Sequence, residues 1–179
     1  LQTYSTGDRD FSAQLTSILI ANPDGLFIPD YHSAAGPILL QAHQFGLNCV
    51  KLGVDGWDSP DLTRLAAGNE EGGYYVNHYS VLDTREATVE FINKYRAKYN
   101  ADPDALAALG YDAMLIIKAA LEQAGSTDPV ALKNALGTVK NVVAATATID
   151  MDPEGTPYKP LVILQIQNGQ PVVVDRVYP

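Results

Sequence analysis

The sequence predicts an α/β fold, in which a parallel sheet is flanked by helices in three layers and an antiparallel strand unit closes the chain. Segments with helical spacing of apolar residues alternate with short strand-like runs over the first 80 residues. These runs are continuously apolar, which is typical of strands in a parallel sheet covered on both faces. The end of the chain has strand-like runs separated by turn sequences instead, which indicates antiparallel pairing there.

The alternation comprises three helix–strand units. In the first unit, apolar residues recur at helical spacing and the segment Asn22-Pro23-Asp24-Gly25 ends the helix before a strand. The third unit opens with Ser59 as the N-cap and Pro60 as the first helical residue. The expected helices and strands are 11–19 and 26–29, 34–45 and 49–53, and a short helix from 59 followed by 73–79.

The second half of the chain is predicted to be helical before it returns to strands. The helix expected at 105–124 is apolar almost all round, so it needs packing partners on most sides. Two turns, at 152–155 and at Asn168-Gly169, separate the terminal strands. The remaining expected elements are helices at 84–99 and 128–136 and strands at 145–150, 161–167 and 171–177.

Composition excludes several classes of function. The 179 residues include 21 acidic and 12 basic side chains, a net charge of −9, without a cluster of Lys and Arg, so nucleic acid is a poor partner. No apolar run reaches the roughly 18 residues that span a bilayer, and we expect any targeting segment to be removed or to lie outside this sequence. The single cysteine, Cys49, cannot form an intrachain disulfide and is interpreted as a small buried side chain.

Motifs for catalysis are absent from the sequence. It contains no glycine-rich phosphate loop and no G-x-S-x-G nucleophile motif, which disfavours nucleotide chemistry and acyl transfer. Of the three histidines, His32, His43 and His78, only His32 has a second ligand-type residue at close spacing, Asp30, so a metal site is disfavoured. Asp55 and Asp58 could form the carboxylate pair of a glycosidase, but such pairs are common by chance. We therefore expect no enzyme activity, no cofactor and no metal.

Recognition chemistry is the better interpretation of the polar and aromatic residues that follow or close the strands. Ligands of parallel sheets bind beyond the carboxyl ends of the strands. An ionised Asp beside aromatic rings suits a small cationic group, because the carboxylate gives charge-assisted hydrogen bonds and the rings add cation–π attraction. The residues of this kind are Tyr31, Asp55, Trp57 and Tyr79. The alternative is that they are packing residues, above all Trp57 in the core.

Five segments of the sequence resemble the branched-chain amino acid binding proteins of ABC importers. Their order and spacing match, and the likeness covers nearly all of the chain. The segments are Tyr4-Ser5-Thr6-Gly7-Asp8-Arg9-Asp10-Phe11, residues 28–33, Leu52-Gly53-Val54-Asp55-Gly56-Trp57-Asp58-Ser59-Pro60, Ala108-Leu109-Gly110-Tyr111-Asp112-Ala113 and residues 150–155.

The resemblance implies two α/β lobes that are joined by a hinge and close on an amino acid. Residues 1–100 would form the α/β domain of the second lobe, 101–142 would be helices that pack on a first lobe, and 143–179 would return to the second lobe and hinge. The first lobe's sheet has no counterpart in this sequence, so we expect a fragment with only part of the ligand site. Such a half-site should bind free amino acids poorly.

The resemblance also implies roles for single residues. Asp55 would bind the α-ammonium group of the ligand, and Tyr31 would be the aromatic residue beside it. Tyr4, Trp57 and Tyr111 would line the cleft, and the side chains at these places vary with the ligand class. Tyr79, at the end of the third strand, completes the set of expected ligand-binding residues.

The expected partners follow from the same resemblance. They are a small-molecule amino acid, the membrane permease of an ABC importer and the first lobe, with self-association through the exposed face of the helix at 105–124 as a further possibility. The expected location is periplasmic or extracellular, with membrane association in Gram-positive hosts. The alternative function is the ligand-sensing domain of a receptor or regulator, which has the same lobe fold.

Overall fold

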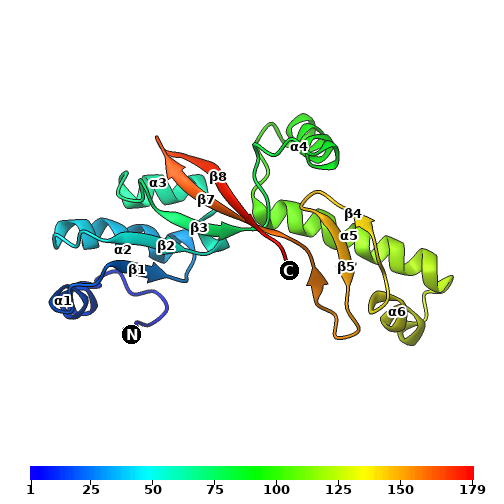
Figure 1. Cartoon of the computed structure of the whole chain (residues 1–179), viewed down its shortest axis with the longest axis horizontal. Coiled ribbons are helices and arrows are strands. Elements are labelled where there is room, and N and C mark those ends of the chain that lie inside the picture. Colours follow the sequence, from blue (N-terminus) through cyan, green and yellow to red (C-terminus); the bar gives the residue numbers. More distant parts are fainter. The chain divides into compact units, whose positions relative to one another are not determined.

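The computed structural model describes all residues from 1 to 179 and contains two compact units (Figure 1). Unit 1 consists of Leu1–Asn77 and Ile163–Asp175. Unit 2 consists of His78–Val162 and Arg176–Pro179. The chain therefore crosses between the units three times, once after Asn77 and twice within its two last strands.

Unit 1 is built on a sheet whose first three strands are parallel. Ile28 of β1 pairs with Gly53 of β2, and Gly53 pairs in turn with Tyr75 of β3. Each parallel connection passes through a helix, and right-handed crossovers between successive strands put both helices on one face of the sheet. The elements are α1 (Ser12–Ile20), β1 (Gly25–Ile28), α2 (His32–Gln44), β2 (Val50–Gly53), α3 (Pro60–Ala66) and β3 (Tyr74–Asn77).

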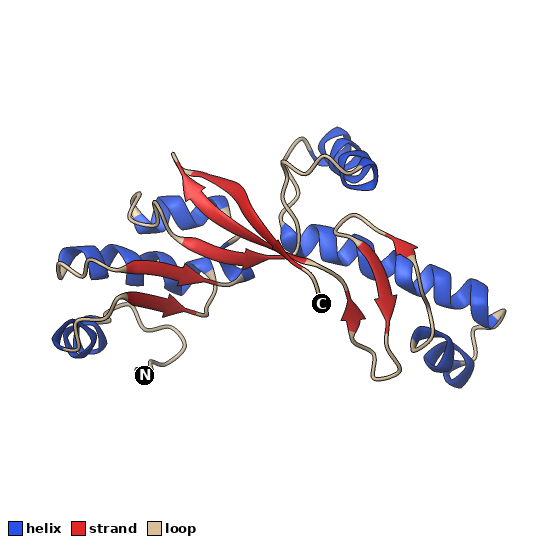
Figure 2. Cartoon of the chain, in the orientation of Figure 1, coloured by secondary structure: helices blue, strands red, loops and turns tan.

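A terminal hairpin completes this sheet, in the order β1-β2-β3-β7-β8 (Figure 2). Strands β7 (Leu161–Gln167) and β8 (Gln170–Val177) are joined by Asn168 and Gly169, both with positive φ, as a tight two-residue hairpin turn requires. The Glu71 carboxylate fixes the turn, because it accepts the backbone N–H groups of Asn168 at 2.7 Å and Gly169 at 3.0 Å. These hydrogen bonds, that from Gly169 first, lower the pKa of Glu71.

The two faces of the parallel strands differ in exposure. Leu26, Ile28 and Tyr75 are buried, and they alternate with residues that point to the other face. On that other face Phe27 is 58% exposed, and its partner in the neighbouring strand, Leu52, is exposed as well. Unit 1 thus has one covered and one open sheet face.

Unit 2 packs three helices with a small antiparallel sheet of order β4-β5-β6. One apolar cluster joins α5 and α6 to this sheet, with Val139, Ile149 and Met151 buried in it. A second cluster joins Phe91 and Ile92 of α4 to the start of α5. The elements are α4 (Glu86–Tyr99), α5 (Ala105–Ala124), α6 (Pro129–Leu136), β4 (Val142–Val143), β5 (Thr148–Met151) and β6 (Pro157–Tyr158).

A buried polar network holds α5 to the segment between β4 and β5. The Asp112 carboxylate accepts the backbone N–H groups of Ala145 at 2.6 Å and Thr146 at 3.0 Å, and also the Thr146 hydroxyl. Lys159 donates to the same hydroxyl at 2.8 Å. Burial lowers the pKa of Lys159 to about 8, assisted by the charge of Arg85 and opposed by that of Asp112.

The α/β class, with a sheet that is mainly parallel, helices and a separate antiparallel unit, is confirmed. The helices expected at 84–99, 105–124 and 128–136 are present with small shifts of their ends. The strand expected at 145–150 is the shorter β5, and it pairs with β4 and β6, which the sequence did not indicate, because both contain only two residues. No helix of the chain combines the length and the apolar character required to cross a bilayer.

The boundaries between the two units differ from the expected boundaries after residues 100 and 142. Residues 78–100 lie in the same unit as α5, because Phe91 and Ile92 pack with Ala105 and Ala108 in one cluster. The strand expected at 73–79 ends at Asn77, which is also the last residue of the first segment of unit 1. The assignment of these segments to lobes of a larger protein stays a prediction.

Two neighbouring glutamates should affect stability in opposite directions. Glu70 is 1% exposed, and neither of its carboxylate oxygens has a hydrogen-bond partner, so Glu70→Met should raise the free energy of unfolding by about 1–3 kcal/mol. Glu71→Gln is the matched control and should lower that free energy, because the charge that accepts two N–H groups is lost. Urea unfolding of both variants at pH 7 measures this. A loss of stability in Glu70→Met would contradict the assignment.

The stability of the chain should depend on Lys159 above neutral pH. Because the folded-state pKa of about 8 lies below the ordinary 10.5, the unfolded chain binds more protons between these values, and stability should rise with pH across this window. Relative to Lys159→Met, the natural chain should therefore gain stability from pH 8 to pH 10. Lys118→Met, at an exposed position of α5, is the control for the loss of a lysine. A constant difference between the natural chain and Lys159→Met would contradict this expectation.

Candidate functional site

The candidate site lies where β1 and β2 end side by side. Ile28 and Gly53, the last residues of the two strands, are register partners. Asp30 and Tyr31 follow β1 after Pro29, and Asp55 begins the short 3-10 helix η1 (Asp55–Trp57) that follows β2. The parallel sheet therefore delivers two carboxylates and an aromatic ring to one edge, at the carboxyl ends of its strands.

Trp57 fixes the loop after β2 onto the sheet. Its side chain is 1% exposed, and its indole N–H donates to the carbonyl oxygen of Ile28 at 3.2 Å. A Cβ at Gly53 would lie 2.2 Å from the indole ring, so only glycine leaves room for Trp57 over the end of β2. The ring also lies near Tyr75 of β3, with 6.2 Å between the centroids. One side chain thus lies against the ends of β1 and β2 and near the second residue of β3.

Gly56 brings the two loops into backbone contact. A Cβ at Gly56 would lie 2.8 Å from the carbonyl oxygen of Asp30 and 3.0 Å from the Cα of Tyr31. The residue before Gly56 is Asp55, whose side chain is exposed. The close approach at Gly56 therefore places Asp55 beside the turn that contains Tyr31.

Asp30 and Tyr31 are held in a defined conformation. The Asp30 carboxylate accepts the backbone N–H of Tyr31 at 2.6 Å and the hydroxyl of Tyr4. The backbone carbonyl of Tyr31 accepts from Ala34 and Ala35 at the start of α2, which leaves the Tyr31 side chain outside the helix and 59% exposed. The accessible surface at this edge is thus formed by an aromatic ring and acidic side chains.

Tyr4 reaches the same edge from the start of the chain. Its ring packs edge-on against Phe11, with 5.1 Å between the centroids, and its hydroxyl donates to Asp30. Burial, together with this hydrogen bond and the charge of Asp30, raises the pKa of Tyr4 to about 12. Tyr4 therefore remains a neutral donor near physiological pH.

The other two tyrosines expected to bind ligand belong to unit 2. Tyr79 is buried in the cluster with Phe91 and Ala105, and its hydroxyl donates to the carbonyl oxygen of Pro103. Tyr111 lies on α5 and is partly exposed, with its ring 4.9 Å from that of Phe91. The burial of Tyr79 and Trp57 gives both residues a packing role in this structure.

The structure thus brings Tyr4, Tyr31 and Asp55 together within unit 1, with Trp57 beneath them. Sequence reasoning missed Asp30 as the residue that connects Tyr4 to Tyr31. It also missed Gly53 and Gly56 as positions where a side chain would collide with Trp57 or with the backbone of Asp30. The available signal was that both glycines flank Asp55 directly after a strand.

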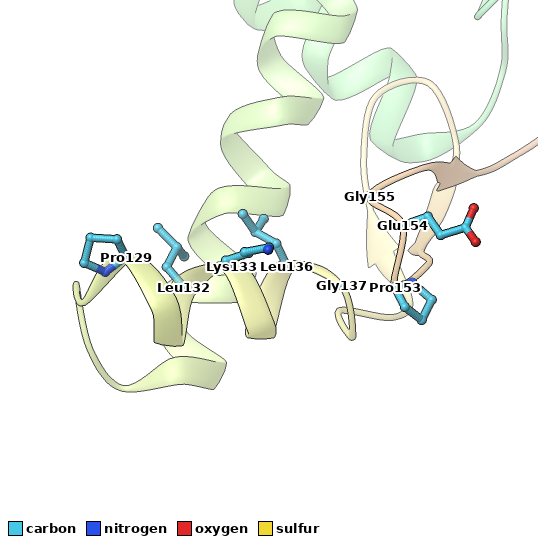
Figure 3. Close-up of a pocket in the computed structure, with 8 residues that line it drawn as sticks. All are labelled: Pro129, Leu132, Lys133, Leu136, Gly137, Pro153, Glu154 and Gly155. Carbon is cyan, nitrogen blue, oxygen red and sulfur yellow. The ribbon is translucent and has the colours of Figure 1, made fainter.

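A hollow in unit 2 is lined by none of the expected ligand-binding residues. It lies between α6 and the turn after β5, and its walls are mainly apolar (Figure 3). The residues that line it are Pro129, Leu132, Lys133, Leu136, Gly137, Pro153, Glu154 and Gly155.

The sequence matches the model of a known protein family over most of its length. The model of the family described as periplasmic binding protein matches residues 2–171, which is most of the chain. The chain belongs to the periplasmic binding protein family. The resemblance seen in the sequence is therefore confirmed.

Relatives in this family include proteins named for amino acid binding. The chain is 29% identical over 154 residues to the Leu/Ile/Val-binding protein homolog 3 of Brucella melitensis. These aligned residues are 86% of this chain and 41% of the relative. A second relative, the leucine-, isoleucine-, valine-, threonine- and alanine-binding protein of Pseudomonas aeruginosa, is 29% identical over 133 residues, or 74% of this chain and 35% of the relative. The chain thus spans less than half the length of these curated relatives.

Two solved structures of amino acid binding proteins match nearly all of this chain. The leucine binding protein LivK from Thermotoga maritima matches with a TM-score of 0.92 and 32% identity over 98% of this chain and 51% of that chain. The substrate binding protein LivJ from Streptococcus pneumoniae, solved in complex with isoleucine, matches with a TM-score of 0.84 and 28% identity over 99% of this chain and 51% of that chain. The named relatives are binding proteins rather than enzymes.

Gly53 should be necessary for the position of Trp57. Gly53→Ala should cost about 1–3 kcal/mol of stability and move the ring, because the new Cβ cannot share space with the indole. Trp57 is the only tryptophan, so its fluorescence emission should shift to longer wavelength as the ring gains contact with water. Gly25→Ala in β1 is the control, because its Cβ would make only ordinary contacts of 3.6 Å or more. Unchanged emission in Gly53→Ala would contradict the assigned role.

Proposed function

We propose that unit 1 of this chain carries the ammonium-binding side of an amino acid site, formed by Asp55 and Tyr31 with Tyr4 beside them. The observation that supports this most strongly is the contact at Gly56, which brings the Asp55 loop to the Tyr31 turn at the ends of two paired strands. The side chains of Asp55 and Tyr31 are exposed there, whereas Trp57, which holds the Asp55 loop on the sheet, is buried.

The chemistry of this edge suits a small organic cation. An ammonium group has three donors, and the Asp55 carboxylate can accept from it with charge assistance. The Tyr31 ring adds cation–π attraction when its face turns toward the same group. Tyr4 is a neutral donor beside Asp30, so the edge contains acceptors for a cation. No Lys or Arg lies between Asp30 and Ser33 or between Val54 and Pro60, and the one basic side chain there is His32.

The ligand is proposed to be an amino acid of the branched-chain type. The relatives are named for leucine, isoleucine and valine, and one solved neighbour was crystallised with isoleucine. An apolar side chain leaves the ammonium and carboxylate groups as the only charged points for recognition. In this proposal the acidic edge of unit 1 recognises the ammonium group, and the ligand carboxylate is bound by groups outside this edge.

The wider role is part of the same proposal. We infer a non-catalytic, extracytoplasmic component of an ABC importer, in the periplasm or, in Gram-positive hosts, associated with the membrane, which delivers the amino acid to a membrane permease. The names of the relatives support this role over that of a receptor domain. We also propose that the exposed face of α5 mediates self-association.

Asp55 should dominate amino acid binding by the chain. Asp55→Asn should weaken the affinity for leucine about 10-fold or more, since a hydrogen bond to a charged group contributes about 1.5–3 kcal/mol. Asp61→Asn, which removes an exposed acid paired with Arg64 on α3, is the matched control and should leave the affinity unchanged. Chemical-shift titration with leucine measures both variants.

The absolute affinity of the isolated chain should be low. One charged contact in an open, solvated edge offsets little of the cost of immobilising the ligand, so we expect a Kd of about 1 mM or weaker for leucine, isoleucine and valine. Equal weakening by Asp55→Asn and Asp61→Asn would overturn the proposed site. Micromolar or tighter calorimetric binding would overturn the half-site interpretation.

A further inference from the structure

Asp30 has a structural role that leaves a second negative charge at the proposed site. One oxygen of its carboxylate accepts the backbone N–H of Tyr31 at 2.6 Å, which holds the turn between β1 and α2. Asp55 is exposed and lies nearby, since a Cβ at the next residue, Gly56, would be 2.8 Å from the backbone carbonyl oxygen of Asp30. The edge thus contains two carboxylates, although an amino acid of the branched-chain type has only one ammonium group.

Tyr4 supplies a donor to the other oxygen of the Asp30 carboxylate. The Tyr4 hydroxyl donates to Oδ2 of Asp30, whereas the Tyr31 N–H donates to Oδ1. Asp30 is only partly exposed, in contrast to Asp55. Each oxygen of the Asp30 carboxylate therefore already has a donor from the chain itself, and Asp55 is the more accessible of the two acids.

The position of Tyr4 is fixed by contacts that do not involve Asp30. The Tyr4 ring packs edge-on against Phe11, which is 2% exposed. The side chain of Gln41 in α2 accepts the Phe11 N–H at 2.8 Å and donates to the Arg9 carbonyl oxygen at 2.8 Å, so the segment after Tyr4 is attached to the helix. The fold of unit 1 thus directs the hydroxyl to Asp30 before any ligand binds.

The Tyr4 hydroxyl also remains a donor wherever the ligand carries an ammonium group. Burial, together with the hydrogen bond to Asp30 and the charge of Asp30, raises the pKa of Tyr4 to about 12. This value lies well above the range in which α-amino groups lose their proton. A change of pH within that range therefore does not remove the donor from Asp30.

We propose that Tyr4 is a specificity-determining residue, which favours ligands with a single ammonium group over diamino acids such as lysine. Specificity is a difference between two affinities, and it can come from a reduced gain for the wrong ligand. A second ammonium group would have to share Asp30 with the Tyr4 hydroxyl or displace it. Tyr4 acts through Asp30 and is therefore a positioning residue. This inference rests on the proposed ammonium site and names the class of amino acid that the site disfavours.

Lysine and norleucine test this role, because they have the same carbon chain and differ in the second ammonium group. Tyr4→Phe keeps the ring that packs on Phe11 and removes the hydroxyl. The ratio of the lysine affinity to the norleucine affinity should then rise about 2- to 5-fold, the gain expected from one partly exposed ion pair. Chemical-shift titration of the 179-residue chain measures both affinities. Tyr158→Phe, which removes an exposed hydroxyl in unit 2, is the matched control and should leave the ratio unchanged.

A second substitution shows whether the gain depends on Asp30. When Asp30→Asn is added to Tyr4→Phe, the rise in the ratio should disappear, because the Asn amide oxygen can still accept the Tyr31 N–H but carries no charge. An unchanged or lower ratio in Tyr4→Phe would overturn the role of Tyr4. A rise that persists in the double variant would overturn it as well.

Asp55→Asn distinguishes this inference from the proposed function. Norleucine has one ammonium group, so its affinity should fall in Asp55→Asn as that of leucine does. An unchanged norleucine affinity in this variant would overturn both the ammonium site and the role of Tyr4. A weaker norleucine affinity in Asp55→Asn, combined with a constant ratio in Tyr4→Phe, would overturn the role of Tyr4 alone.

Discussion

The candidate site depends on the packing of one indole ring against the three parallel strands of unit 1. Trp57 donates to the Ile28 carbonyl of β1, occupies the space left by Gly53 on β2 and packs near Tyr75 of β3. Because the ring is buried, the backbone of the Asp55 loop cannot move without loss of core packing. The cost of ordering this loop is therefore met during folding, before any ligand binds.

Much of this arrangement could be predicted from the sequence. Short apolar runs after helices locate the strand ends, so the sequence predicts Tyr31 and Asp55 at one edge of the sheet. The direction of the Trp57 ring could not be predicted, because a tryptophan after a strand is compatible with both cleft and core. The same rule predicts Tyr79 at this edge, but β3 ends two residues before Tyr79, and the ring packs on α4 and α5. Such outcomes depend on tertiary packing, which local patterns do not encode.

Each unit has apolar side chains that the other elements of the same unit do not cover. In unit 1, successive right-handed crossovers between neighbouring strands put α2 and α3 on the same face, which leaves Phe27 and Leu52 open. In unit 2, the small antiparallel sheet covers only one side of a 20-residue helix.

The central claim is that the Asp55 edge recognises an ammonium group. It is tested most directly by comparing leucine with two analogues, 3-methylbutylamine, which has the amine without the carboxylate, and 4-methylpentanoate, which has the carboxylate without the amine. The carboxyl carbon resonance of Asp55 and the ring resonances of Tyr31 are followed during each titration. The account requires that leucine and the amine shift both residues and that 4-methylpentanoate shifts neither. Shifts with 4-methylpentanoate alone, or with none of the three, would contradict it.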